Sequence, residues 1–239
     1  MIPNIIHYCW FGRGEMPELA QECIASWHRY MPEYTFKCWN EDSFDVNGVP
    51  YVNEAYEVGK FAFVSDYVRL WALEMDGGLY LDTDVEVFKP FDDLLHLSAF
   101  AGFEGSKHLP VGTCVMASEA HGAWVTEMLT AYNGRHFLLP NGTHDLTTNV
   151  QFITAIMANN GFLQDGVEQE YLDLHVFPVE YFSPRHTTGE YIRTDNTYCD
   201  HRGLSSWYDR NGGWKEFVLK RVGPKNMTRL IKLKRLLFE

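Results

Sequence analysis

Three acidic residues spaced two apart, Asp82, Asp84 and Glu86, are the residues of this sequence best suited to chemistry. They lie in the stretch 79–88, where apolar and polar side chains alternate. Alternation with period two predicts a strand that carries Tyr80 and the three acids on one face. Carboxylates stacked in this way repel one another unless a cation lies between them, and Mg²⁺ and Mn²⁺ take carboxylate ligands. The alternative is a solvated turn, because Asp-x-Asp is common without a metal.

The residues before these acids predict a helix that brings further polar groups to them. Asp66 and Arg69 are three apart, which makes them neighbours on the surface of this helix. Gly77-Gly78 supplies the left-handed residue that ends it. Its apolar stripe is Val64, Val68, Trp71 and Met75.

The remaining pattern predicts an α/β fold, in which ligands lie outside the carboxyl ends of the strands. We expect strands over 2–11, 34–39, 99–103 and 111–117, and helices over 17–30, 121–133 and 149–160. Asn53 is expected to cap a short helix, and residues 162–200 to be rich in loops.

Asp145 and Asn149 form a polar patch just before the helix 149–160. A helix N-terminus offers free N–H groups, so this patch is a candidate for acceptor or sugar contacts. Ordinary helix capping explains it equally well.

Composition narrows the class of protein. The 239 residues carry a net charge of −12, which argues against general nucleic-acid binding. Residues 215–239 contain eight Lys or Arg against two acids, so this segment carries +6 and residues 1–214 carry −18. We therefore expect one catalytic domain over 1–214 and a basic amphipathic helical tail over 215–239. The tail binds a membrane surface or packs on the core.

The five cysteines form no close pair, which favours reduced thiols in a cytoplasmic protein. No signal peptide and no long apolar segment are evident. We expect a cytoplasmic location, with attachment to the inner face of the membrane through 215–239 as one alternative.

The order and spacing of these motifs resemble the glycosyltransferases that carry a DXD motif in a sugar-binding region. This family, glycosyltransferase family 32, includes Och1-like mannosyltransferases and bacterial capsule and lipopolysaccharide sugar transferases, with the clostridial glucosylating toxins more distant. The matching residues are Ile2-Pro3-x-Ile5-Ile6-His7-x-x-Trp10-x-Gly12, Ala62-x-x-Ser65-Asp66-x-x-Arg69, Gly77-Gly78-x-Tyr80-x-Asp82-x-Asp84, His201 and Ser206-Trp207.

The resemblance implies a GT-A type fold, with a Rossmann-like mixed sheet and flanking helices. It implies that Asp84 binds Mn²⁺ or Mg²⁺ directly, that Asp82 contacts ribose and the metal's shell, and that His201 completes the metal site. A tryptophan usual between the histidine and Ser-Trp is replaced here by Arg202-Gly203, which leaves the role of His201 less defined.

The resemblance also assigns the donor site. Trp10 lies beside the nucleotide base, with a core tryptophan as the alternative. Asp66 contacts sugar hydroxyls, and Arg69 lies near them or near the diphosphate. Ser206 and Trp207 close on the diphosphate. His7 is expected to be a core histidine.

The implied function is a metal-dependent, retaining transfer of a hexose from a UDP- or GDP-sugar to a glycan or lipid-linked acceptor in surface polysaccharide synthesis. A metal-dependent hydrolase is one alternative, although Trp10, Arg69 and Ser-Trp have no role there. A nucleotide-sugar or glycan-binding module without transferase activity is the other. The donor, the acceptor, the linkage and the oligomeric state stay open.

Overall fold

The computed structural model describes residues 1–105, 109–184 and 191–203. The chain divides into two compact units, Met1–Leu204 and Ser205–Glu239. All described residues belong to the first unit, so the predicted tail 215–239 lies outside the described residues.

A mixed sheet of seven strands forms the centre of the first unit, in the order β2-β1-β3-β6-β5-β8-β7. Strands β1, β2 and β3 are parallel, β6 runs antiparallel to both β3 and β5, and β8 is parallel to β5. The strands are β1 (Ile5–Cys9), β2 (Thr35–Trp39), β3 (Gly78–Leu81), β5 (Ala99–Phe103), β6 (Val111–Ser118), β7 (Gln169–Tyr171) and β8 (Leu174–Phe177). A second, two-stranded sheet pairs β4 (Val85–Val87) with β9 (Cys199–His201).

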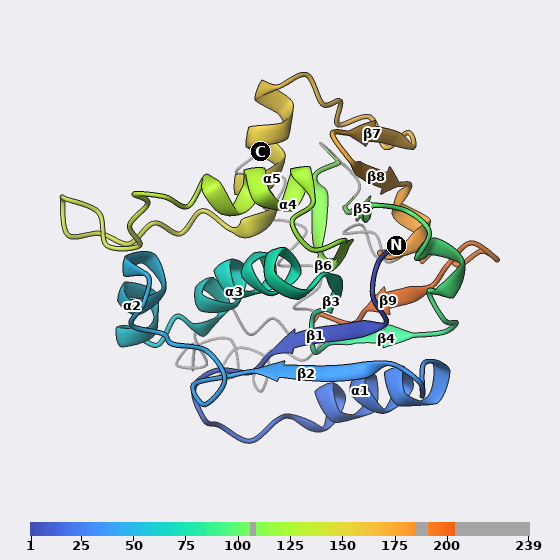
Figure 1. Ribbon diagram of the computed structural model, residues 1–239, viewed down its shortest axis with the longest axis horizontal. Helices are drawn as coiled ribbons and strands as arrows, with labels where there is room; N and C mark the ends of the chain where they lie inside the picture. The colour runs from blue at the N-terminus through green and yellow to red at the C-terminus, as the bar shows by residue number, and fades with distance from the viewer. Residues whose placement is uncertain (106–108, 185–190, 204–239) are drawn as a thin grey trace, which may run out of the picture. The chain divides into compact units, whose positions relative to one another are not determined.

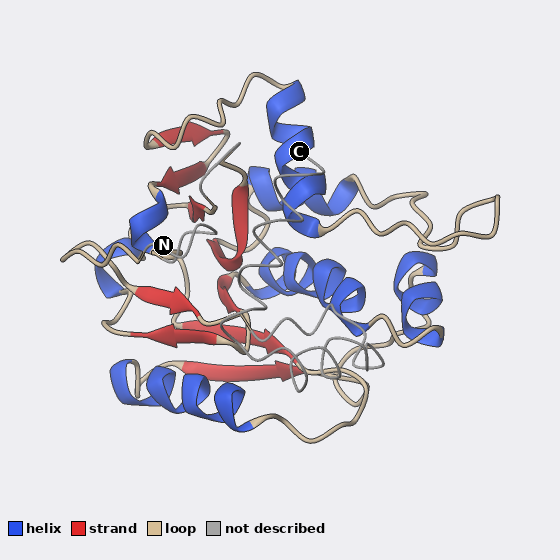
Figure 2. Ribbon diagram, turned by 180° about the vertical axis from the view of Figure 1, so that it is seen from behind, coloured by secondary structure: helices blue, strands red, loops and turns tan. Residues whose placement is uncertain are grey.

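Helices cover the sheet, and α1 and α3 lie on opposite sides of β1 and β2 in Figure 1; Figure 2 shows the same arrangement from behind. The helices are α1 (Glu18–Tyr30), α2 (Pro50–Glu57), α3 (Phe61–Asp76), α4 (Ala123–Thr130) and α5 (Asn149–Asn159), with short 3₁₀ turns at Asp92–Leu94 and Val179–Tyr181. These elements establish the α/β class expected from the sequence.

Strand alternation divides the core into two clusters. On β3, Tyr80 packs in the cluster that holds residues of α2, α3, α4 and α5, whereas Leu79 and Leu81 pack in the cluster that holds Trp27 of α1. Successive side chains of a strand point to opposite faces, so a short strand contributes to both clusters.

The predicted strand over 79–88 is wrong as one element. The chain leaves β3 at Asp82, turns, and begins β4 at Val85, with the Val85 N–H donating to the Asp82 carbonyl at 3.0 Å. The turn separates Glu86 from the other two acids, and Glu86 forms an ion pair with Arg202.

Two smaller expectations also differ, the start of α2 and the burial of Met75. Pro50, not a cap at Asn53, begins α2, because proline presets the first-turn backbone angle. Residues 162–200 are rich in loops, as expected, and also contain β7, β8 and the start of β9. On α3, Met75 is 49% exposed and so does not join the predicted apolar stripe, and Asp66 and Arg69 lie on the buried face of the helix.

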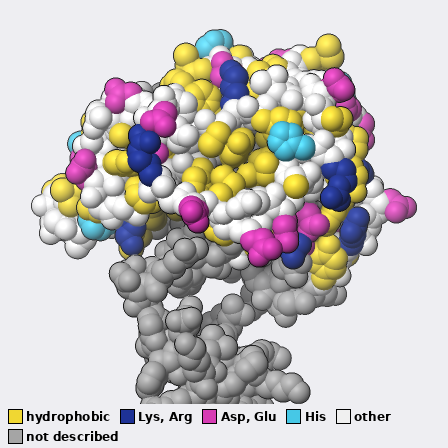
Figure 3. Space-filling view, turned by 90° about the horizontal axis from the view of Figure 1, so that it is seen from below, with side chains coloured by type: hydrophobic (Ala, Val, Ile, Leu, Met, Phe, Trp, Pro, Cys, Tyr) yellow, Lys and Arg dark blue, Asp and Glu magenta, His cyan; other side chains and the backbone are white. Residues whose placement is uncertain are grey.

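Among the described residues, no helix is long and apolar enough to cross a membrane. Hydrophobic side chains gather near the centre of the face seen from below, and charged side chains of both signs lie around them (Figure 3).

Candidate functional site

The turn between β3 and β4 places two carboxylates at the carboxyl end of the parallel strands. Asp82 follows β3 directly, and its N–H donates to the Cys114 carbonyl of β6 at 2.9 Å. The tight turn at Thr83 breaks the alternation of the strand, so Asp82 and Asp84 approach the same space instead of spreading along one face. This is the region where open α/β sheets bind ligands.

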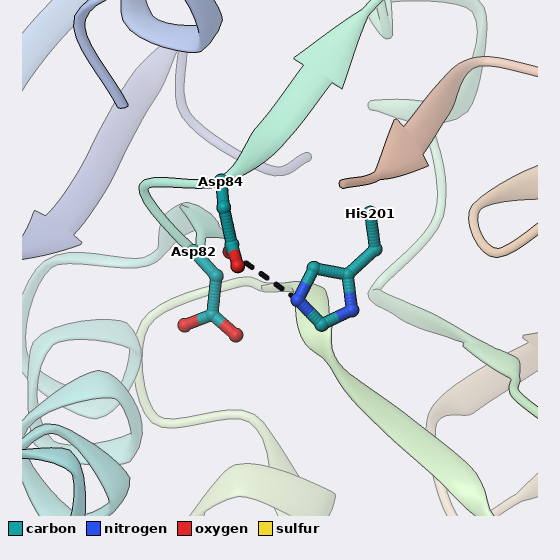
Figure 4. A group of neighbouring side chains, drawn as sticks. All are labelled: Asp82, Asp84 and His201. Atoms are coloured by element: carbon teal, nitrogen blue, oxygen red, sulfur yellow. Dashed lines mark ion pairs between the residues drawn. The ribbon is translucent and has the colours of Figure 1, made fainter. Parts of the chain in front are cut away.

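His201 reaches these carboxylates from the far end of the described chain. It closes β9, whose antiparallel pairing sets His201 opposite Val85, the residue after Asp84. Asp82, Asp84 and His201 each offer one ligand atom, and these atoms lie within 4.8 Å of one another. Figure 4 shows the three side chains converging from the turn and from β9, with the His201 Nε2 atom 3.2 Å from the Asp84 Oδ1 atom.

The donor set fits a divalent cation. Asp84 is 8% exposed, and two carboxylates packed this closely at a buried site favour a positive charge between them. Burial opposes protonation of His201, but the Cys114 thiol and the Asp84 carboxylate raise the pKa of His201 well above its ordinary value. Carboxylate oxygens suit Mg²⁺ and Mn²⁺, and an imidazole ligand favours the transition metal.

Arg69 joins this group to the core of α3. Its Nη2 atom lies 3.2 Å from a carboxylate oxygen of Asp66 and 3.2 Å from one of Asp82. Its Nη1 donates to the Thr113 carbonyl at 2.7 Å, and its guanidinium lies 4.5 Å from the centre of the Tyr80 ring. The side chain is 2% exposed, so one buried cation serves two carboxylates.

Tyr80 and Arg69 together orient Asp82. The Tyr80 hydroxyl donates to the Asp82 Oδ1 atom at 2.9 Å, the same oxygen that Arg69 approaches. The side chain of Asp82 remains 21% exposed. One oxygen is therefore held by the protein while the residue still reaches the open side of the site.

Asp66 is completely buried, and it contacts Arg69 as their spacing of three predicts. Its Oδ2 atom accepts from the Asn149 N–H at 3.1 Å, and the Asn149 Nδ2 atom donates to the Asp66 carbonyl at 3.1 Å. Burial raises the pKa of Asp66 to about 7, against the opposing effects of Arg69 and Asn149. The helix spacing is as expected, but packing of α5 on α3 covers the pair.

The side chains of Asp145, Thr148 and Asn149 in the polar patch form hydrogen bonds or ion pairs with other groups of the protein. Thr148 caps α5 through a capping box with Gln151, which agrees with the alternative of ordinary helix capping. Asn149 is 1% exposed. Asp145 forms an ion pair of 2.8 Å with Arg135, whose guanidinium stacks over Phe152.

Trp10 lies at the end of β1, the strand next to β3. It is half-buried, and its indole N–H donates to the Gly14 carbonyl at 2.7 Å. In the following loop, Gly12 has a φ of +94°, and a Cβ there would lie 2.3 Å from the Phe61 ring. The loop therefore packs closely on the start of α3 and holds Trp10 at the same sheet edge as Asp82.

His7 is a core histidine, as expected. It is fully buried, its Nδ1 accepts from the Trp39 indole N–H at 3.0 Å, and its Nε2 donates to the Gly77 carbonyl at 2.7 Å. Ser206 and Trp207 lie outside the described residues.

Sequence reasoning missed Glu104. Glu104 follows β5, and β5 runs parallel to β3 with β6 between them. The carboxyl end of β5 therefore lies at the same edge of the sheet as Asp82. The expected strand over 99–103, combined with the rule about carboxyl ends, could have drawn attention to it.

Residues 17–101 match the family described as glycosyltransferase sugar-binding region containing DXD motif. The glucan organizing enzyme 1 of Cryptococcus neoformans var. grubii is 36% identical over 80 residues, which are 30% of this chain and 22% of that protein. The inositol phosphoceramide mannosyltransferase 3 of Schizosaccharomyces pombe is 33% identical over 106 residues, 41% of this chain and 29% of that protein. The chain thus aligns with under a third of the length of either relative.

Among solved structures, the PaToxG glycosyltransferase superimposes with a TM-score of 0.50 at 15% identity, over 67% of this chain and 70% of that chain. This likeness shows a shared fold. The family match contains Asp66, Arg69, Asp82 and Asp84, the residues around which the sheet edge is built. Residues 17–101 of the chain thus resemble the DXD-containing sugar-binding region of glycosyltransferases, and the chain has an α/β fold of the GT-A type.

Proposed function

We propose that this chain is a metal-dependent glycosyltransferase that moves a hexose from a UDP- or GDP-sugar to a glycan or lipid-linked acceptor. The observation that carries the proposal is the convergence of Asp82, Asp84 and His201 at the carboxyl edge of the sheet, within 4.8 Å of one another. The family match supports the reaction class, and the donor set supports a divalent cation, with Mn²⁺ favoured by the imidazole.

In this proposal, Asp84 and His201 hold the cation and Asp82 completes the group. When bound, the cation neutralises the negative charge that develops on the nucleoside diphosphate as the sugar–phosphate bond breaks. Arg69 and Tyr80 keep Asp82 in a single orientation, so little reorganisation is needed during the reaction.

The donor roles follow the family motif. Trp10 binds beside the base. Asp66 and Arg69 form the part of the site next to the donor sugar and the diphosphate. Ser206 and Trp207 cover the diphosphate and exclude water. Because Asp66 is fully buried and bonded to Arg69 and Asn149, its contribution is to position the groups beside it. Retention of the anomeric configuration is proposed from the resemblance.

The fission yeast relative is named an inositol phosphoceramide mannosyltransferase, which makes a lipid-linked acceptor and GDP-mannose natural candidates. A role in surface polysaccharide synthesis, and membrane attachment through 215–239, are part of the same proposal. The segment 215–239 lies outside the described residues.

The test is nucleoside diphosphate release from UDP-glucose, UDP-galactose, UDP-N-acetylglucosamine and GDP-mannose, with and without Mn²⁺. Asp84→Ala is compared with Asp195→Ala, which removes an exposed carboxylate away from the group. We expect Mn²⁺-dependent release from one donor, lost in Asp84→Ala and kept in Asp195→Ala.

Two other outcomes would overturn the transferase. Metal-dependent binding of a nucleotide-sugar without any release would favour a binding module. Release that yields only free sugar, with every acceptor glycoside offered, would favour a hydrolase.

A further inference from the structure

Glu104 is an acidic side chain beside the candidate metal group that no role above uses. It follows β5 and closes toward β6, with its N–H donating to the Pro110 carbonyl at 2.9 Å. This hydrogen bond ties the residue to the start of β6, so its position is set by the sheet rather than by a free loop.

The sheet places Glu104 two strands away from Asp82. The order β3-β6-β5 and the antiparallel pairings bring the carboxyl ends of β3 and β5 to one edge. Neighbouring strands lie about 4.8 Å apart, so the two acidic residues follow strands roughly 10 Å apart. β5 also extends further along β6 than β3 does, because Phe103 pairs with Val111 and Leu81 pairs with Val115.

Gly112 makes the space in which the Glu104 carboxylate lies. A Cβ at Gly112 would meet the Glu104 Oε2 atom at 3.0 Å and the Glu104 Cβ atom at 3.3 Å. Between Ala101 and Gly102 of β5 the partner on β6 shifts from Met116 to Gly112, so β6 is irregular over residues 113–115. His201, Arg69 and Asp82 all contribute to the pKa of Glu104, so the carboxyl group lies near the candidate metal group.

Glu104 is near the metal group without belonging to it. The ligand atoms that cluster within 4.8 Å are those of Asp82, Asp84 and His201. Burial raises the pKa of Glu104, His201 and Arg69 oppose that rise, and Asp82 adds to it. Within residues 1–105, 109–184 and 191–203, no ion pair and no hydrogen bond to the Glu104 carboxylate is formed, so its acceptor oxygens are available to a ligand.

We infer that Glu104 accepts hydrogen bonds from hydroxyl groups of a carbohydrate bound against the Asp82, Asp84 and His201 group. The inference rests on the proposed function and adds a residue that determines sugar binding. Hydroxyl donors to a carboxylate form short, strong hydrogen bonds, and a buried acceptor without a donor carries a desolvation cost that a bound hydroxyl group offsets. The hydroxyls belong to the donor sugar or to the acceptor, and the experiment distinguishes the two.

The experiment uses the full chain with Mn²⁺ and the donor that is turned over in the test above. Glu104→Gln keeps the shape of the side chain and removes its charge, and Glu104→Ala removes the carboxylate. Glu170→Gln is the matched control, because Glu170 is 78% exposed on β7. Three quantities are measured for each variant: affinity for the free nucleoside diphosphate, donor hydrolysis without acceptor, and transfer to a panel of methyl hexosides.

Both Glu104 variants are expected to bind the free nucleoside diphosphate within about twofold of wild type, since Glu104 lies outside the metal group. If the hydroxyls belong to the donor, the kcat/KM of donor hydrolysis falls at least about tenfold, the worth of one charge-assisted hydrogen bond. If they belong to the acceptor, hydrolysis is unchanged and the kcat/KM of transfer falls by a similar factor. Glu170→Gln changes none of these quantities.

Unchanged hydrolysis and transfer in both Glu104 variants would overturn the inference while the proposed function stands. A loss of nucleoside diphosphate affinity as large as the loss of hydrolysis or transfer would also overturn the inference, because Glu104 would then act by supporting the metal group. Failure of the wild-type protein to bind any nucleotide would overturn the proposed function itself. Thermal unfolding of each variant separates loss of folding from loss of contact, and the isosteric Glu104→Gln is the decisive variant.

Discussion

Replacing Arg69 by methionine tests whether one buried cation holds the site together. Arg69 lies 3.2 Å from both Asp66 and Asp82, and the Asp66 side chain is 1% exposed. Methionine fills much of the volume and removes the charge, which leaves Asp66 buried without its cation. Removing one partner of a buried ion pair costs about 3–5 kcal/mol of the free energy of unfolding. That is a large part of the roughly 5–15 kcal/mol that stabilises a typical domain.

The cost depends on pH in a predictable direction. Burial raises the pKa of Asp66 to about 7, above its ordinary value of about 3.9. The folded state therefore binds a proton that the unfolded chain has released between about pH 4 and pH 7, so this group makes stability fall as the pH rises through that window. Without Arg69, which lowers the pKa, the window extends above pH 7. Arg69→Met is thus more destabilised relative to wild type at about pH 8 than at about pH 5.5.

The measurement is urea unfolding of both proteins at the two pH values. Arg13→Met is the matched control, since the Arg13–Asp42 pair is 2.7 Å long but 61% and 72% exposed. An exposed pair contributes about 0–1 kcal/mol, and little change is expected. A loss below about 1 kcal/mol in Arg69→Met, or an equal loss at both pH values, would refute the reasoning.

Three further substitutions test separate contacts. His201→Ala is expected to weaken Mn²⁺-dependent nucleotide binding at least about tenfold by calorimetry, because it removes one of three ligand groups. Asn149→Ala removes the hydrogen bond from the Asn149 side chain to the Asp66 carbonyl, keeps the one from the backbone N–H, and is expected to cost about 1–3 kcal/mol in thermal unfolding. Gly12→Ala is expected to cost about 1–3 kcal/mol and to weaken nucleotide binding, because φ is +94° and Phe61 occupies the space of the new methyl group.

Each has a matched control on the same fold. His96→Ala removes an exposed histidine, and nucleotide binding should stay at the wild-type level. Asn160→Ala removes an exposed hydrogen bond at the end of α5, and equal losses for Asn149 and Asn160 would contradict the buried role. Gly134 also has a positive φ, of +74°, but open space around it, so an equal cost there would show that Phe61 is irrelevant.

Local sequence signals determined many elements because they depend on neighbouring residues alone. Gly77 ends α3 in the left-handed region with a φ of +64°, and Thr148 with Gln151 caps α5. The strands Ala99–Phe103 and Val111–Ser118 agree with the apolar runs that predicted them. The order of motifs also led to the family whose description residues 17–101 match.

Tertiary structure decided how these residues face one another. A spacing of three places Asp66 beside Arg69 on α3, but only the packing of α5 and β6 against that face makes the pair a buried bridge to Asp82. Alternation along 79–88 predicted three acids on one face, and the turn at Thr83 retained two of them. Two hydrogen bonds stabilise the turn: the Val85 N–H donates to the Asp82 carbonyl, and the Asp82 N–H donates to the Cys114 carbonyl of β6. Sequence periodicity does not indicate such bonds.

The positions of His201 and Glu104 at the site were likewise decided by tertiary structure. His201 reaches Asp84 because β9 pairs with β4, and Glu104 reaches the same edge because β5 and β3 flank β6. Both residues are distant in sequence from the aspartates, and local propensity contains no information about which strands pair. The sequence alone thus determined the identity of the chemical groups and the elements that carry them. Pairing of strands and packing of helices, driven by burial of the two apolar clusters, decided which of those groups meet.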